Sequence, residues 1–140
     1  MKTAKTTISL ILSLVFIVCL VSCSEQKATG LWENATYIED TELGSGSKTV
    51  VVDVKVEDKT VRFTVKTDKD TVGEALMEHD LIAGEEGQYG LYVKVVNGIR
   101  ADYDVDKSYW AFYINGEYAM TGVELTEIDE GSIYQLEYAK

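Results

Sequence analysis

The middle of the chain alternates apolar and polar positions with a period of two. Valines occupy every second position over residues 50–56, and the positions between them are mostly polar or charged. After a polar turn at residues 57–59, Val61, Phe63 and Val65 alternate in the same way with Arg, Thr and Lys. This period is typical of strands that bury one face. We therefore expect a β-hairpin whose apolar face lies on the core.

The spacing of apolar residues becomes helical after residue 70. Thr71 is followed three residues later by Glu74, which is the pattern of a capping box. The apolar positions that recur at helical spacing are Val72, Ala75 and Leu76, extended by Met77 and Leu81. Gly84 stands where a helix would end. We expect one helix between Thr71 and Gly84.

The rest of the chain predicts further strands. Residues 89–96, 109–114, 118–121 and 132–139 are rich in apolar and aromatic residues, and Asn-Gly pairs follow the first two stretches. Asn-Gly between such stretches is the strongest short signal for a hairpin turn. Because the chain has no proline, Gly, Asn, Asp and Ser must form its turns. Residues 99–108 and 122–131 are expected to be loops.

The segment before the first hairpin is ambiguous. Residues 32–41 (WENATYIEDT) fit either an edge strand or an ordered loop, with Trp32, Tyr37 and Ile38 as anchors. The following LGSGSK is expected to be a flexible turn. The element order is ββαβββ, so we predict an α+β fold with one helix on one face of a mixed sheet. This is the order of a β-grasp-like domain.

The N-terminus has the features of a bacterial lipoprotein signal. Lys2 and Lys5 precede an apolar run over residues 8–21, which is too short to be a convincing membrane-spanning helix. The run ends in Leu-Val-Ser-Cys, which resembles a lipobox and implies lipidation of Cys23 and cleavage before it. The alternative is an ordinary secretory signal. We predict a signal peptide at 1–22, a lipidated cysteine and tether at 23–31, and one domain at 32–140.

Charge and cysteine content narrow the classes of protein. The formal charge of −11 argues against nucleic-acid binding, because phosphates attract Lys and Arg. Of the two cysteines, Cys19 would leave with the signal and Cys23 would carry lipid. The mature chain would then have neither a disulfide nor a free thiol, so its stability must come from the core.

Several stretches together resemble the transcobalamin-like C-terminal domain family. They are YGLYVKVVNGI, then ADYD and SYWAFYINGEYAMTGVE, then IDEG before YQLEY. The resemblance covers about residue 34 to the end, and its most specific part is YW-x(3)-ING-x(5)-G. Bacterial members are surface proteins, many of them known only as domains of unknown function. The resemblance implies a β-grasp domain of the soluble-ligand-binding type and cobalamin as a possible ligand. In transcobalamin and intrinsic factor a large helical domain forms the opposite wall of the cobalamin site, and this chain has no counterpart to it.

The stretch YWAFYINGEYAMTG supplies the candidate binding residues. A two-residue turn at Asn115-Gly116 would place Trp110, Phe112, Ile114 and Ala119 on one face, which we assign to the core. The other face would carry Tyr109, Tyr113, Tyr118 and Met120, together with Ala111. Tyrosines with an apolar body and a polar tip are typical of recognition surfaces. The alternative is that these tyrosines merely solubilise an open sheet face.

Other residues are weaker candidates for a functional site. His79 is the only histidine, and its neighbours Glu78 and Asp80 suggest a solvated helix position rather than an axial cobalt ligand. Residues 102–106 have the D-x-D-x-D spacing of a calcium loop, but Lys107 stands where that loop needs glycine. We therefore predict no metal site. Because no nucleophile-and-base set is visible, we also predict that the chain is not an enzyme and requires no cofactor.

These inferences lead to two hypotheses about function. The first is a lipid-anchored module on the outer face of a bacterial membrane, with a Gram-positive surface as the expected setting. It would hold a soluble ligand such as cobalamin or another corrinoid and pass it to a transporter. The second is a cell-surface module that uses the same tyrosine face to bind a protein or glycan without a small-molecule ligand.

Overall fold

The computed structural model describes residues 27–140, so the predicted signal peptide, Cys23 and the start of the tether lie outside the described residues. In chain order the elements are η1 (Gly30–Asn34), β1 (Thr41–Gly44), β2 (Lys48–Val56), β3 (Lys59–Thr67), α1 (Val72–Glu78), β4 (Ile82–Gly87), β5 (Gly90–Val96), β6 (Ile99–Arg100), α2 (Tyr103–Asp106), β7 (Tyr109–Ile114), β8 (Glu117–Tyr118), η2 (Val123–Leu125) and β9 (Ile133–Ala139). Within these residues no helix has the length and apolar character needed to cross a membrane.

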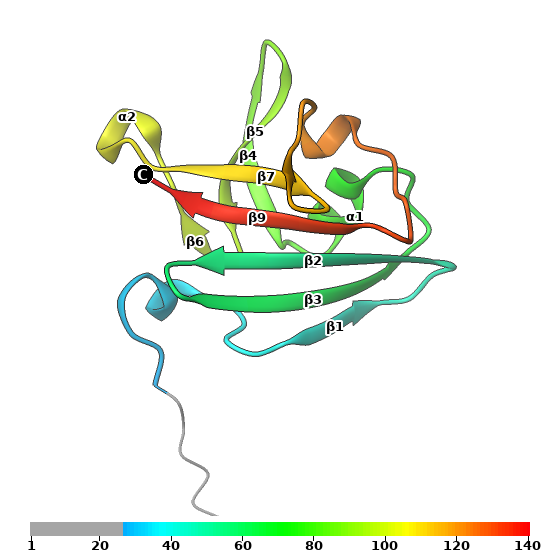
Figure 1. The fold of residues 1–140 in the computed structure, drawn as a ribbon, viewed down its shortest axis with the longest axis horizontal. Helices are drawn as coiled ribbons and strands as arrows, with labels where there is room; N and C mark the ends of the chain where they lie inside the picture. The colour runs from blue at the N-terminus through cyan, green and yellow to red at the C-terminus, as the bar shows by residue number, and fades with distance from the viewer. Residues whose placement is uncertain (1–26) are drawn as a thin grey trace, which may run out of the picture.

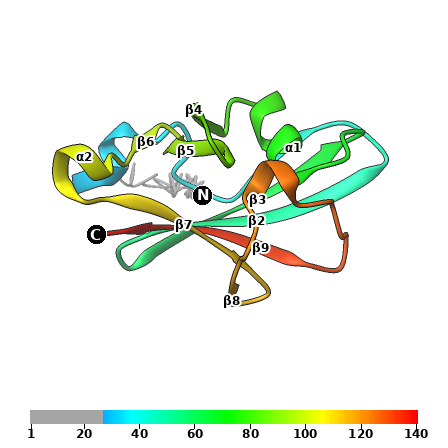
Figure 2. The same cartoon turned by 90° about the horizontal axis from the view of Figure 1, so that it is seen from above.

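The strands form two sheets that lie in two layers (Figure 1). The larger sheet has the order β1-β3-β2-β9-β7-β8, and the smaller has the order β4-β5-β6. Figure 2 shows α1, α2 and the smaller sheet on one face of the larger sheet, whose other face is open. The larger sheet is mixed, because β1–β3 and β2–β9 are parallel and the other pairs are antiparallel. The predicted α+β, β-grasp-like fold class is confirmed.

The predicted hairpin forms the centre of the core. β2 and β3 pair antiparallel, with Val52 opposite Phe63 and Val54 opposite Val61. All seven alternating apolar side chains of the two strands are at most 1% exposed. Period-two alternation therefore identified both the strands and their buried face.

The C-terminal strand β9 joins the two halves of the larger sheet. It pairs parallel with β2, where Tyr134 lies opposite Val52, and antiparallel with β7, where Leu136 lies opposite Phe112. Tyr134 and Leu136 are each 1% exposed. The Tyr134 hydroxyl also accepts a hydrogen bond from the Asp129 N–H (2.9 Å), which ties the turn before β9 to the core.

The helix begins as predicted but ends earlier. Thr71 and Glu74 form both halves of the capping box. The helix ends at Glu78 rather than near Gly84, since Asp80 adopts a positive φ of 54° and redirects the chain. Gly84 lies instead in β4, beside a β-bulge, where a Cβ atom would overlap the carbonyl oxygen of Tyr92. Gly84 therefore allows the backbones of β4 and β5 to approach closely, and it does not end the helix.

Four short elements were missing from the sequence prediction. β1 begins at Thr41, the last residue of the ambiguous segment, and ends in the stretch expected to be a flexible turn. β4 comes soon after the helix and has mostly exposed residues. β6 and α2 lie in the expected loop over 99–108. These elements are at the edges of sheets or on the surface, so they lack the apolar periodicity that reveals a buried face. Of the nine strands of the described residues, β1, β4 and β6 were not expected from the sequence.

The ambiguous segment before β1 is an ordered, packed connection and not a strand. Trp32 lies in η1 and donates its indole N–H to the carbonyl of Val56 (3.2 Å). The ring of Tyr37 packs edge-on against Phe63, with 5.7 Å between ring centroids. The side chain of buried Asn97 bonds to both the N–H and the C=O of Tyr37. The predicted anchors Trp32 and Tyr37 thus fix this segment to the core.

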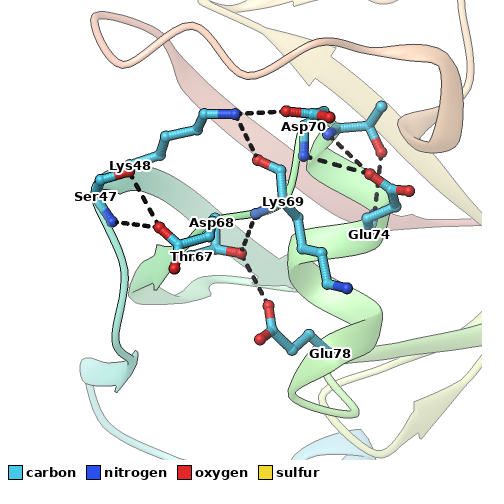
Figure 3. A network of polar contacts seen from close by, with 9 residues as sticks. Ser47, Lys48, Thr67, Asp68, Lys69, Asp70, Glu74 and Glu78 are labelled. Atoms are coloured by element: carbon cyan, nitrogen blue, oxygen red, sulfur yellow. Dashed lines mark hydrogen bonds and ion pairs between the residues drawn. The ribbon is translucent and has the colours of Figure 1, made fainter.

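A polar network holds the start of β2 against the connection between β3 and α1 (Figure 3). The Asp68 carboxylate accepts hydrogen bonds from the N–H (2.9 Å) and the hydroxyl (3.1 Å) of Ser47. The ammonium group of Lys48 donates to the Asp70 carboxylate (2.7 Å) and the Lys69 carbonyl (2.9 Å). Hydrogen bonds from Ser47 lower the pKa of Asp68, and the bond from Lys48 lowers the pKa of Asp70.

This network predicts a loss of stability in acid. Because the folded-state pKa of Asp68 lies below its ordinary value of about 3.9, its contribution is present above that pH and is lost as the pH falls through the lowered pKa. The difference in unfolding free energy between the wild type and Asp68→Asn should therefore be constant near neutral pH and shrink below about pH 4. Urea unfolding from neutral to acidic pH measures it. Asp58→Asn, in the β2–β3 turn, is the control, and a difference that does not change with pH would contradict this assignment.

Candidate functional site

The main surface depression of interest is a groove between β5 and residues 118–125. It consists of two adjoining hollows of about 340 and 520 Å³, which share Met120, Thr121 and Gly122. The first hollow runs between β5 and β7, and the second lies under the turn that joins β4 to β5. The lining residues of the two hollows are Gln88, Tyr89, Gly90, Leu91, Tyr92, Val93, Trp110, Phe112, Tyr118, Ala119, Met120, Thr121, Gly122, Val123, Leu125 and Leu136.

No charged side chain lines this groove, although a quarter of the chain's residues (26%) are charged. By contrast, a hollow beside η1 is lined by Lys27, Glu57, Asp58 and Lys59, and another beside α2 is lined by Arg100, Asp102 and Asp106. A surface of mixed polar and apolar character without charged lining residues suits a neutral ligand with apolar faces. It offers no ionic partner for a phosphate or a carboxylate.

The rim of the groove carries large side chains that are left in solvent. Met120 is 95% exposed and Tyr89 is 88% exposed. Tyr92, Tyr118 and Leu125 are also exposed. Exposed apolar and aromatic side chains gathered at one place often mark a binding surface, because leaving them in water is unfavourable.

The wall formed by residues 122–126 is held firmly by its neighbours. One carboxylate oxygen of Glu124 accepts a hydrogen bond from the Leu91 N–H (2.7 Å), which joins this wall to β5. The Val72 N–H donates to the carbonyl of Thr126 (2.8 Å), which joins it to α1. Gly73 allows the close approach, because a Cβ atom there would lie 2.8 Å from the Glu124 backbone. The groove is thus a formed feature and not a gap between mobile loops.

Trp110 lines the first hollow of the groove and is mostly buried. Its side chain is 8% exposed and packs edge-on against Tyr138, with 5.6 Å between ring centroids. Within the described residues its indole N–H has no hydrogen-bond partner. Most buried polar groups are paired, so this unpaired donor is an exception among the buried groups of the described residues.

The structure divides the four candidate residues predicted from the sequence. Tyr118 and Met120 line the groove, whereas Tyr109 and Tyr113 do not. The rings of Tyr113 and Tyr118 are in contact at 89°, with 5.6 Å between centroids. Tyr109 is 38% exposed and belongs with Tyr113 to the open face of the larger sheet.

The predicted face assignment fails after Tyr118. The two-residue turn is correct, since Ile114 pairs with Glu117 and Tyr113 with Tyr118. β8 ends at Tyr118, however, so the expected pair of Ala111 and Met120 does not form. The chain turns away toward η2, and Met120 joins Trp110 and Phe112 along the groove instead of the face of Tyr113. Ala111, expected on the exposed face, is 3% exposed.

Three rim residues were not predicted from the sequence: Tyr89, Tyr92 and Leu125. Tyr89 and Tyr92 lie on the β4–β5 hairpin, which could not be recognised while β4 was missing. The signal available was the run from Glu85 to Tyr92, in which Gly87 and Gly90 enclose a two-residue turn. Leu125 lies in a 3₁₀ helix within an expected loop. Its hollow is completed by Gln88, Tyr89 and Gly90, which lie 35 to 37 residues earlier in the chain, so local patterns could not place it.

The weaker candidates lie elsewhere. His79 caps the end of α1, and its Nε2 is buried without a partner among the described residues, so its predicted solvated setting is wrong. Residues 102–106 form α2 in place of a calcium loop, and hydrogen bonds from Ser108 lower the pKa of Asp106. Over residues 27–140 no group of three potential ligands among His, Cys, Asp and Glu is placed to hold a metal.

Fold and groove together define the class of protein: a β-grasp-like α+β domain with an open, uncharged surface groove. The profile of the family described as "Domain of unknown function (DUF4430)" matches residues 69–139, and the chain belongs to this family. No curated protein matches the sequence.

Two solved structures have similar folds. One is a protein from Ruminococcus gnavus ATCC 29149 described as a "putative metal binding protein", which is 29% identical with a TM-score of 0.63. The similarity covers 67% of this chain and 98% of that one. The other is haptocorrin in complex with Cbi, 20% identical with a TM-score of 0.53. It covers 66% of this chain and 25% of haptocorrin, so it supports the transcobalamin-like resemblance at the level of the fold.

The hydrogen bond between Glu124 and Leu91 yields a prediction about the groove wall. Glu124→Ala removes the acceptor and should release β5, so the Leu91 amide should exchange with solvent at least about tenfold faster. The unfolding free energy should fall by about 1 kcal/mol, the usual value of one such bond. Glu124→Gln keeps an acceptor and should largely preserve the exchange rate. Glu127→Ala, in the same segment, is the control. Unchanged protection of Leu91 in Glu124→Ala would show that the wall is held by other contacts.

Proposed function

We propose that the mature chain is a lipid-anchored binding module on the outer face of a bacterial membrane. In this proposal Cys23 carries the lipid, and the groove holds a soluble small ligand such as cobalamin or another corrinoid. The observation that carries the proposal is the groove itself, which is uncharged, firmly walled and rimmed by exposed Tyr118 and Met120. The proposal includes no catalytic step.

The comparisons support this function at a coarse level. The fold is shared with haptocorrin, which was solved with Cbi, and this makes a corrinoid the first ligand to test. The Ruminococcus gnavus protein suggests metal binding as another activity, but residues 27–140 hold no cluster of three potential metal ligands. A neutral organic ligand with apolar faces agrees better with the groove lining.

The position of the anchor supports an outward-facing groove. Lys27, the first described residue, lies in a hollow beside the β2–β3 turn, and Trp32 fixes the segment there. Cys23 precedes Lys27 by four residues and so lies within about 14 Å of it. In Figure 1 the start of the described chain, which leads into η1, lies at the bottom of the molecule, whereas the tip of the β4–β5 hairpin projects at the top. An anchor at Cys23 would leave the groove accessible to ligands and to a transporter.

Titration of the purified protein with cyanocobalamin and cobinamide tests ligand capture. We expect saturable heat in calorimetry, with Tyr118→Ala and Met120→Ala each raising Kd about five- to thirtyfold through lost apolar contact. Val105→Ala, an 80% exposed apolar position on α2, should leave Kd unchanged.

Tyr109→Ala is the matched control within the tyrosine set. If it weakens binding as much as Tyr118→Ala, the site is the open face of the sheet and not the groove. If no corrinoid produces heat at concentrations up to about 1 mM, the corrinoid proposal is wrong. The alternative then gains support: a surface module that binds a protein or glycan through the same exposed side chains.

The anchor is tested separately. In cells that express the full chain, the wild type should be found in the membrane fraction and should incorporate radiolabelled fatty acid. Cys23→Ala should lose the label and appear in the soluble or secreted fraction, because two acyl chains give stable anchoring. Cys19→Ala is the matched control and should behave as the wild type. Retention of Cys23→Ala in the membrane fraction would refute lipid anchoring at this position.

A further inference from the structure

The terminal strands of the two sheets are protected by charge. A strand with an unpaired edge can pair with another chain, and proteins usually prevent this with charged side chains or very short strands. The terminal strands all carry charge: Glu42 in β1, Glu85 and Glu86 in β4, Arg100 in β6 and Glu117 in β8. Three of the four are also only two to four residues long.

Such protection is missing along residues 90–93 of β5, where the Glu124 carboxylate accepts the Leu91 N–H, and along the first half of β7. β8 covers only Tyr113 and Ile114, so no strand of the described chain pairs with residues 109–111 on the side away from β9. This stretch, with Phe112 beside it, reads Tyr-Trp-Ala-Phe and contains no charge. It is an uncharged edge in a chain whose formal charge is −11.

The register shows which backbone groups point outward from this edge. The Asn115 N–H donates to the carbonyl of Ile133. In an antiparallel pair the backbone groups of every second residue point to the same neighbour, so those of Tyr109 and Ala111 also point toward β9. The alternate residues face the other way, and the Phe112 carbonyl accordingly accepts the N–H of Ala119 (2.9 Å). The N–H and C=O of Trp110 point to the same side, where no strand covers them.

This edge opens into the groove. Trp110 and Phe112 line the first hollow, and Ala119 to Gly122 turn away from the line of β8, which leaves the next strand position vacant. Leu91 and Val93 supply apolar contacts on the opposite wall, and the exposed Met120 side chain stands at the rim.

We propose that the free edge of β7 binds an extended segment of another protein by strand addition. The segment would occupy the position next to β7 in continuation of β8, with backbone hydrogen bonds to Trp110. About three residues fit along 109–111, a length of roughly 10 Å. Alternate side chains would enter the groove, so they should be apolar and uncharged, because the groove offers no ionic partner. This inference goes beyond the small-ligand proposal and does not require a corrinoid.

The probe is a capped eight-residue peptide that alternates threonine with valine or tyrosine. In the free protein the Trp110 amide should exchange with solvent faster than its neighbours Tyr109 and Ala111, which are bonded to β9. Saturating peptide should slow exchange at Trp110 at least about tenfold and leave Tyr109 and Ala111 unchanged. Amide exchange followed by nuclear magnetic resonance on the whole mature chain measures all three.

Two controls separate strand addition from simple apolar contact. The same peptide N-methylated at four consecutive residues keeps its side chains but cannot donate, and it should give no protection. Met120→Lys places a charge at the rim and should weaken peptide binding at least about tenfold, as charged edges do in natural sheets. Val105→Lys is the matched control and should bind as the wild type.

The outcomes are distinct from those of the corrinoid titration. Equal protection by the N-methylated peptide, or none by the parent peptide up to about 1 mM, overturns strand addition whatever cobalamin does. Trp110 protection that rises with protein concentration alone, together with a dimer in light scattering, would assign the edge to a second copy of the chain and overturn the proposed partner. Corrinoid binding without peptide protection would leave the groove as a small-ligand site only.

Discussion

The pairing of β9 between β2 and β7 is the constraint on which the rest of the structure depends. β2 and β3 make one hairpin, and β7 and β8 make another, and within the larger sheet only β9 pairs with both. Burial of Tyr134 and Leu136 in the common core fixes this strand. The register of β9 then determines which face of β7 is buried and which backbone groups point outward. The last residues of the chain thus position a site formed largely by residues 88–125.

The groove follows from the way the β7–β8 hairpin ends. A longer β8 would have covered the edge of β7, and the chain would not have turned away at Ala119. The early turn leaves a hollow between two sheets that come from different parts of the chain. Glu124 then fixes its outer wall to β5 through the Leu91 N–H. The proposed small-ligand site and the proposed strand-addition site both depend on this single short strand and on a groove without charged lining residues.

Local patterns predicted the parts that bury a regular face. Alternating valines identified β2 and β3, the pair of Thr71 and Glu74 identified the start of α1, and both Asn-Gly pairs form the expected turns. β4 was missed because its residues are mostly exposed, so no periodicity reveals it, and Gly84 was read as a helix end for the same reason. Of the candidate site, Tyr118 and Met120 were predicted, whereas Tyr89 and Leu125 were not.

The sequence by itself determined the α+β class, the buried face of the central hairpin and the aromatic stretch near the binding region. These features depend on contacts between residues a few positions apart, and a short pattern records such contacts. The tertiary structure decided which aromatic residues act together. Tyr109 and Tyr118 have the same chemistry and lie on the same hairpin, but only Tyr118 reaches the groove. The reason is that the groove is assembled from β5, β7 and the segment after β8, and their separation is fixed by sheet packing rather than by any local pattern.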